Sequence, residues 1–87
     1  MGRLKEEFLE RLEVFADRVC DVADAVDRVC KSRRVVDQMY GAGTAIAANA
    51  FEADEALSRA DFCKCLGISG KELSETRYWL RLAGRRG

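Results

Sequence analysis

The chain has 87 residues, 15 basic and 15 acidic side chains, and no histidine or proline. Its length allows one small domain, and its composition, 48% hydrophobic and 34% charged, excludes a disordered chain. Zero net charge gives no overall attraction to nucleic acid, and the missing histidine removes the commonest catalytic base and metal ligand.

The first ten residues are charged rather than apolar, and no stretch approaches the roughly 20 apolar residues of a membrane span. We therefore expect a cytoplasmic protein with no membrane partner. Its four cysteines are then expected to be thiols, buried or half-buried, because their spacing does not match a zinc site. They are Cys20, Cys30, Cys63 and Cys65. No metal, cofactor, small-molecule substrate or enzymatic activity is predicted.

A first helix is predicted from about residue 3 to residue 30. Its apolar residues alternate by four and three, which is the spacing of a coiled-coil seam. They are Phe8, Leu12, Phe15, Val19, Val22, Val26 and Val29. Four aspartates on the same helix are interpreted as a solvated flank rather than a cation site. They are Asp17, Asp21, Asp24 and Asp27.

A second helix is predicted over residues 33–53, with Ser32 as its N-cap. Its apolar stripe consists of Val36, Met39, Gly43, Ile46 and Ala50. Because this helix is rich in glycine and alanine, other backbones can approach it closely. We expect it to occupy the most crowded position.

A third helix is predicted over residues 59–83, with Ser58 and Asp61 forming a capping box and Gly84 as the C-cap. Its stripe consists of Phe62, Leu66, Ser69, Leu73, Thr76, Leu80 and Ala83, with Ile68 and Trp79 beside it. Three such helices with short connections predict an all-α, up-down antiparallel bundle in a single domain. The length of the stripes favours self-association.

Two sets of polar residues are candidate sites. Asn49 and Glu52 are interpreted as hydrogen-bonding the turn and the first amides of the third helix, with a polar binding site as the alternative. From Ser58 onward there are seven Lys/Arg against three Asp/Glu. Basic residues with an interleaved aromatic could contact RNA, although charge for solubility explains them too and is the favoured interpretation. They are Lys64, Lys71, Arg77, Tyr78, Arg81, Arg85 and Arg86.

The run from Gln38 to Leu82 resembles the four-helix-bundle family of 23S rRNA intervening-sequence proteins. The residues that carry this resemblance are Ile46, Ala48, Asn49, Glu52, Ala53, Ser58, Asp61, Phe62, Lys71, Glu72, Glu75, Thr76, Tyr78, Trp79 and Leu80. The resemblance implies a helical bundle that assembles into a ring, typically a homopentamer. It also implies kinship with the accessory variability proteins of diversity-generating retroelements, which are associated with reverse transcriptase and RNA.

The family has a fourth helix after the Tyr78-Trp79-Leu80 segment, whereas this chain stops at Gly87. The fourth helix is absent, or another subunit supplies it, or the bundle has three helices. The leading hypothesis is a non-enzymatic, homo-oligomeric scaffold or accessory protein that binds structured RNA or an RNA-handling protein. The alternative is a module whose apolar stripe docks a helix of another protein.

Overall fold

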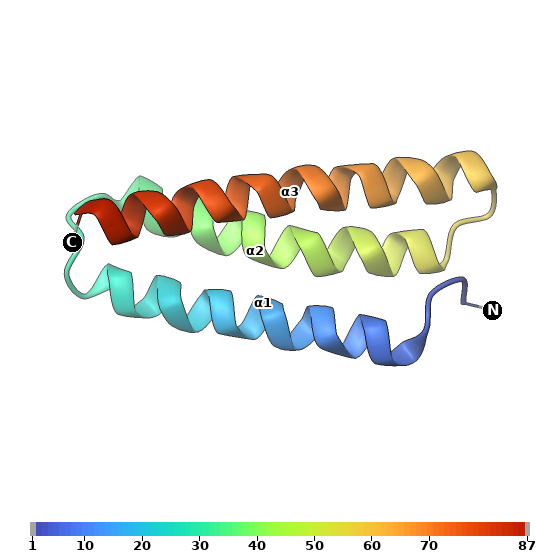
Figure 1. Ribbon diagram of the computed structural model, residues 1–87, viewed down its shortest axis with the longest axis horizontal. Coiled ribbons are helices and arrows are strands. Elements are labelled where there is room, and N and C mark those ends of the chain that lie inside the picture. The colour runs from blue at the N-terminus through green and yellow to red at the C-terminus, as the bar shows by residue number, and fades with distance from the viewer. Residues whose placement is uncertain (1, 87) are drawn as a thin grey trace.

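The computed structural model describes residues 2–86 and contains three α-helices in this range. They are α1 (Glu6–Asp27), α2 (Arg33–Asp54) and α3 (Arg59–Arg86). Figure 1 shows them running alternately in opposite directions along an elongated molecule, with principal extents of 43 × 21 × 16 Å. The prediction of an all-α, up-down antiparallel bundle with three helices is confirmed.

Helix α2 occupies the central position that its small residues predicted. It packs against both of the other helices, whereas α1 and α3 have few direct contacts with each other. The whole predicted stripe of α2 is buried, together with three further alanines. These buried residues are Val36, Met39, Ala42, Gly43, Ile46, Ala47, Ala50 and Ala53. Short side chains therefore allow α2 to bury two faces at once.

The predicted starts of the second and third helices are confirmed by hydrogen bonds, whereas α1 is three residues shorter at each end than predicted. The Ser32 hydroxyl accepts from the Val35 amide at 3.3 Å, and the Ser58 hydroxyl accepts from the Asp61 amide at 3.1 Å. The N-terminal segment is also held in place, because the Leu4 amide donates to an Asp54 carboxylate oxygen at 2.7 Å. This bond joins the start of the chain to the far end of α2.

The predicted end of the third helix is wrong. α3 continues through Gly84 to Arg86, so Gly84 lies inside the helix rather than capping it. One exposed glycine costs a helix only about 1 kcal/mol relative to alanine. Two arginines in the last turn favour the extension because they lie at the negative end of the helix dipole.

The apolar stripe of α1 is buried far less than a coiled-coil seam would be. Of its seven residues only Val19 is buried, and Phe8, Val22 and Val29 are exposed. The reason is that α1 packs against α2 and has few contacts with α3. A coiled-coil seam would be buried only if partner helices covered it from end to end. No helix in residues 2–86 has the length and apolar character needed to cross a membrane.

The core lies between α2 and its neighbours. Ala23 of α1 and Val36 and Met39 of α2 are buried together, and Trp79, Leu80 and Ala83 of α3 pack against them. α3 also buries two residues that carry hydroxyl groups, Ser69 and Thr76. The Ser69 hydroxyl donates to the Ile46 carbonyl oxygen at 2.8 Å, which joins α3 directly to the backbone of α2.

Candidate nucleic-acid interface

One end of the bundle collects most of the positive charge. Figure 1 places the connection between α1 and α2 beside the C-terminal end of α3. Residues 27–37 and 77–86 together contain eight Lys/Arg against two aspartates, a balance of +6. The rest of the chain has seven against thirteen, a balance of −6. We call the eight cations the basic end: Arg28, Lys31, Arg33, Arg34, Arg77, Arg81, Arg85 and Arg86.

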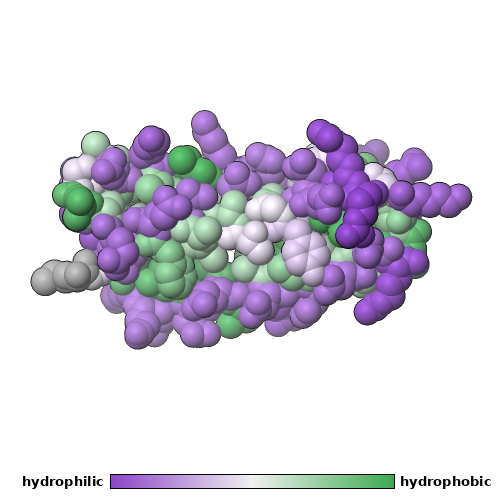
Figure 2. Space-filling view, turned by 180° about the vertical axis from the view of Figure 1, so that it is seen from behind, coloured by the Kyte–Doolittle hydropathy of each residue, from purple (hydrophilic) through white to green (hydrophobic). Residues whose placement is uncertain are grey.

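The charge of the basic end is largely uncompensated. All eight side chains are exposed. Its two aspartates both face Arg33, at 2.6 Å for Asp27 and 3.9 Å for Asp37. Among residues 2–86 there is no other ion pair, so seven cations remain without a carboxylate partner. Figure 2 shows the most hydrophilic side chains gathered at this end of the molecule, on the right of the view.

An exposed aromatic ring lies among these cations. Tyr78 is 57% exposed and lines a hollow of about 440 Å³, together with Arg81, Leu82, Arg85 and Arg86. We call it the Tyr78 hollow. The ring of Tyr78 meets the Trp79 ring edge-on, with 5.0 Å between the ring centroids, and Trp79 in turn packs against the core. A ring supported in this way offers a face on which an RNA base can stack, while the arginines face its phosphates.

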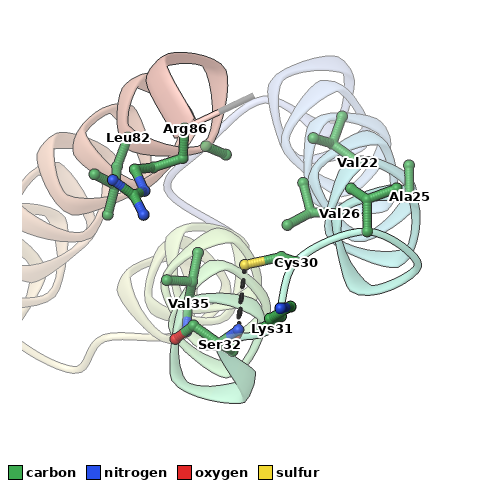
Figure 3. A pocket seen from close by; sticks show the side chains of 11 residues that line it. Val22, Ala25, Val26, Cys30, Lys31, Ser32, Val35, Leu82 and Arg86 are labelled. Atoms are coloured by element: carbon green, nitrogen blue, oxygen red, sulfur yellow. Dashed lines mark hydrogen bonds between the residues drawn. The ribbon is translucent and has the colours of Figure 1, made fainter.

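A second, larger hollow opens at the same end between α1 and α3. We call it the apolar groove, and its volume is about 710 Å³. Figure 3 shows Val22 and Val26 on one wall, Leu82 and Arg86 on the other, and Cys30 at the base. The apolar groove shares Leu82 and Arg86 with the Tyr78 hollow. The two hollows are therefore neighbours.

The structure divides the predicted RNA-contact residues into two groups. All seven are exposed, but only Arg77, Tyr78, Arg81, Arg85 and Arg86 lie at the basic end. At 1.5 Å per residue along α3, Lys71 and Lys64 lie about 22 and 33 Å from Arg86. The sequence did not point to the other four cations, Arg28 and Lys31 in the α1–α2 connection and Arg33 and Arg34 in the first turn of α2, because they are far from the third helix along the chain. The antiparallel topology was the available signal, since it brings this connection beside the end of the third helix.

The interpretation of Asn49 and Glu52 needs correction. The Asn49 side-chain amide donates to the Ala45 carbonyl oxygen of its own helix at 2.9 Å, so it does not reach the turn or the amides of α3. Glu52 is exposed and makes no side-chain hydrogen bond within the described range. Backbone hydrogen bonds from the Glu55 and Ala56 amides close the end of α2, and the Ser58 hydroxyl accepts from the Asp61 amide at the start of α3.

The other family-motif residues are distributed along α3 and its cap. Phe62 is half-buried, with the Arg3 guanidinium 6.0 Å from its ring centroid. Glu72 is half-buried, and its backbone carbonyl accepts from the Thr76 hydroxyl at 2.9 Å. Asp61 and Glu75 are exposed. The indole nitrogen of Trp79 is buried and has no hydrogen-bond partner among residues 2–86. That these residues have structural roles stays a prediction.

The four cysteines differ in exposure. All four are unpaired thiols, and Cys63 is exposed, contrary to the expectation that every cysteine would be at least half-buried. Burial raises the pKa of the Cys20 thiol, and Asp17, Asp24 and Asp21 raise it further, so this thiol is held in its less nucleophilic form. In the described part of the chain no three Cys, Asp or Glu side chains are placed to hold a metal ion.

A family model described as 23S rRNA-intervening sequence protein matches residues 5–87. No curated protein and no solved structure matches the chain. The family match extends the resemblance, which was carried by residues between Gln38 and Leu82, across α1 as well. This chain therefore belongs to the 23S rRNA-intervening sequence protein family.

Proposed function

We propose that this protein is a non-enzymatic RNA-binding protein and that its basic end contacts the phosphates of structured RNA. The seven unpaired cations at this end carry the proposal. Each phosphate that a lysine or arginine neutralises releases a condensed counterion, and this release favours binding at moderate salt concentration. The family name, which refers to ribosomal RNA, supports the same class of partner.

The arrangement of the cations suits a folded RNA better than a long single strand. Four of them come from α3 and four from the segment around the α1–α2 connection, so they cover an end of the molecule rather than line a channel. The two shorter extents of the whole molecule, 21 and 16 Å, are of the same order as the width of an RNA helix or hairpin. Tyr78 adds a stacking surface for a base that is not paired.

Paired charge removals test this proposal. We expect the double variant Arg81→Gln/Arg85→Gln to bind a 5′-labelled RNA hairpin at least about tenfold more weakly. The slope of log affinity against log salt concentration should also become less steep, by the amount expected for the loss of about two phosphate contacts. The matched control Lys64→Gln/Lys71→Gln removes the same charge from the same helix away from the basic end. It should weaken binding less than about threefold. Fluorescence anisotropy at several salt concentrations measures both quantities, and equal losses in the two variants would contradict the proposal.

We also propose that the protein self-associates through the outward face of α2. Tyr40, Gly41, Thr44, Ala48 and Phe51 are exposed along this face and carry no charge. Figure 2 shows an uncharged band of this kind along the middle of the molecule, between hydrophilic flanks. An exposed apolar surface on so small a protein favours association with an equivalent surface.

The native mass in solution tests self-association. Light scattering after size-exclusion chromatography should give a multiple of the 9.7 kDa chain mass. Ala48→Glu places a charge within the band and should lower the mass, whereas Ala60→Glu, at an exposed position at the start of α3, should not. A monomer at every concentration would reject the proposal. A monomer that forms a stable complex with a different protein would favour the helix-docking alternative.

A further inference from the structure

The apolar groove has features that distinguish it from the space around it. Its walls come from the last two turns of α1 and the last turns of α3, and the first turn of α2 closes its base. The groove volume of about 710 Å³ lies within the range of small-ligand sites, roughly 300–1,000 Å³. The lining is mainly aliphatic, with Val22, Val26 and Val29 on one side and Leu82 and Ala83 on the other.

Charged groups border this aliphatic interior. Lys31 and Arg86 line the groove, and neither has an ion-pair partner among residues 2–86. Cys30 lies at the base, where its sulfur accepts from the Ser32 amide at 3.4 Å (Figure 3). α3 ends at Arg86, so its last carbonyl groups lack partners within the helix and add acceptors beside the groove. An apolar body with negative charge on either side and a hydrogen-bond donor would match this lining.

The length of the groove argues against a docked helix. The lining on this side extends from residue 22 of α1 to residue 30, just beyond the end of the helix, which is about 12 Å at the helical rise, in a 43 Å molecule. Farther along the same face of α3 lies Glu75, which is seven residues before Leu82 and exposed. A helix several turns long would have to place its apolar stripe over this carboxylate. A short, flat occupant has no such conflict.

We propose that the apolar groove holds an unpaired nucleobase of a bound RNA, with the phosphates on either side of that base on Lys31 and Arg86. Enzymes and binding proteins hold displaced bases between apolar side chains in this way, and unpaired loops and bulges are the usual targets of specific RNA recognition. This inference rests on the proposed RNA binding. It adds that the protein selects an unpaired base, which the Tyr78 hollow and the arginines alone do not require.

The experiment compares two RNA stems of identical sequence, one fully paired and one carrying a single bulged 2-aminopurine. We expect the protein to bind the bulged stem at least about tenfold more tightly and to change the 2-aminopurine fluorescence. Ala25 is an exposed residue of the groove lining, so Ala25→Phe fills the groove without adding charge. This variant should lose the preference and the fluorescence change, while its affinity for the paired stem stays within about twofold.

Two further variants control for folding and for general effects of bulk. Val14→Phe enlarges an exposed valine of α1 outside the groove and should leave the preference unchanged. Val29→Asn makes the groove polar at a residue that is 78% exposed, so it should weaken the preference without unfolding the protein. Circular dichroism checks that each variant keeps the helical content of the parent.

The outcomes separate this inference from the proposed function. If both stems bind equally and binding still depends on Arg81 and Arg85, the groove does not hold a base, although the protein binds RNA. If neither stem binds, both proposals fail. If Ala25→Phe changes the native mass instead of the RNA preference, the groove is a contact between copies of the chain, and the base-binding inference is overturned.

Discussion

At Gly43, α2 packs closely against α1. A Cβ atom built on Gly43 would lie 2.5 Å from Cγ1 and 2.9 Å from Cβ of Val19. Val19 is buried and β-branched, so it has little rotameric freedom to move away. Gly41, two residues earlier on the same helix, has no atom within 4 Å of such a Cβ. The chain therefore leaves no room for a side chain at Gly43 but leaves room for one at Gly41.

We expect Gly43→Ala to destabilise the protein by about 1–3 kcal/mol, the usual cost of overpacking a core. Gly41→Ala should stabilise the folded chain by up to about 1 kcal/mol, because alanine is the better helix former and no atom of the same chain lies within 4 Å of the added methyl group. Urea denaturation followed by circular dichroism measures both changes. If the two substitutions had the same sign, the close approach of Val19 to Gly43 would be wrong.

Residues with a local role were predictable from sequence, and residues with a distant partner were not. Ser32 and Ser58 were predicted as helix caps because the cap bond joins residues three positions apart. Asp54 was not assigned a role, since its partner is the amide of Leu4, 50 residues away. Asn49 was misinterpreted because its side chain bonds to the preceding turn of its own helix, a competing option that a sequence pattern does not exclude.

At the scale of elements, one hydrogen bond joins the exposed sides of α1 and α2. The Tyr40 hydroxyl donates to the Asp24 carboxylate. The pKa of Tyr40 is raised to about 12, mainly by this hydrogen bond and, to a smaller extent, by desolvation and by the negative charge of Asp24. Because the folded-state pKa lies above the usual value of about 10, the bond contributes fully below pH 10. Its contribution is lost as the pH rises from about 10 through 12.

We expect Asp24→Asn to lower the pKa of Tyr40 towards its usual value. The chain has two tyrosines, so Tyr78→Phe leaves Tyr40 as the only one. Absorbance of the tyrosinate during an alkaline titration in that background then reports Tyr40 alone. Asp17→Asn is the matched control, because Asp17 is not among the groups that shift the pKa of Tyr40. An unchanged titration in Asp24→Asn would show that the hydrogen bond does not form in solution.

The helices themselves followed closely from sequence periodicity, but their ends and exposed faces did not. The number of helices, the N-caps and the buried stripe of α2 were all predicted. The end of α3 was not, because a glycine signals a helix end only when the chain turns there, and at Gly84 it does not. The α1 stripe was predicted correctly as a pattern, yet its burial depends on how many neighbours α1 has.

At the scale of the whole molecule, the absence of net charge conceals a strong separation of charge. Residues 27–37 and 77–86, which contain the basic end, carry +6, and the remainder of the chain carries −6. The sequence shows an excess of positive charge after Ser58 but does not link it with residues 28–34, because their proximity is a property of the folded chain. Five of the seven predicted contact residues lie at this end, and the four cations that complete it come from the α1–α2 connection and the first turn of α2. An anionic partner therefore meets an oriented dipole rather than a neutral particle.

The order of packing within the bundle has a consequence for how it comes apart. α2 lies between α1 and α3, and these outer helices have little contact with each other. Such a stack resembles a linear array, in which stability is a sum of interfaces between neighbours. α1 can then detach while α2 and α3 remain a helical hairpin. Detachment of α1 would remove one wall of the apolar groove and leave Tyr78 and its arginines in place. Amide hydrogen exchange should accordingly be faster in α1 than in α2. The apolar groove would be lost each time α1 detaches, whereas the Tyr78 hollow would remain.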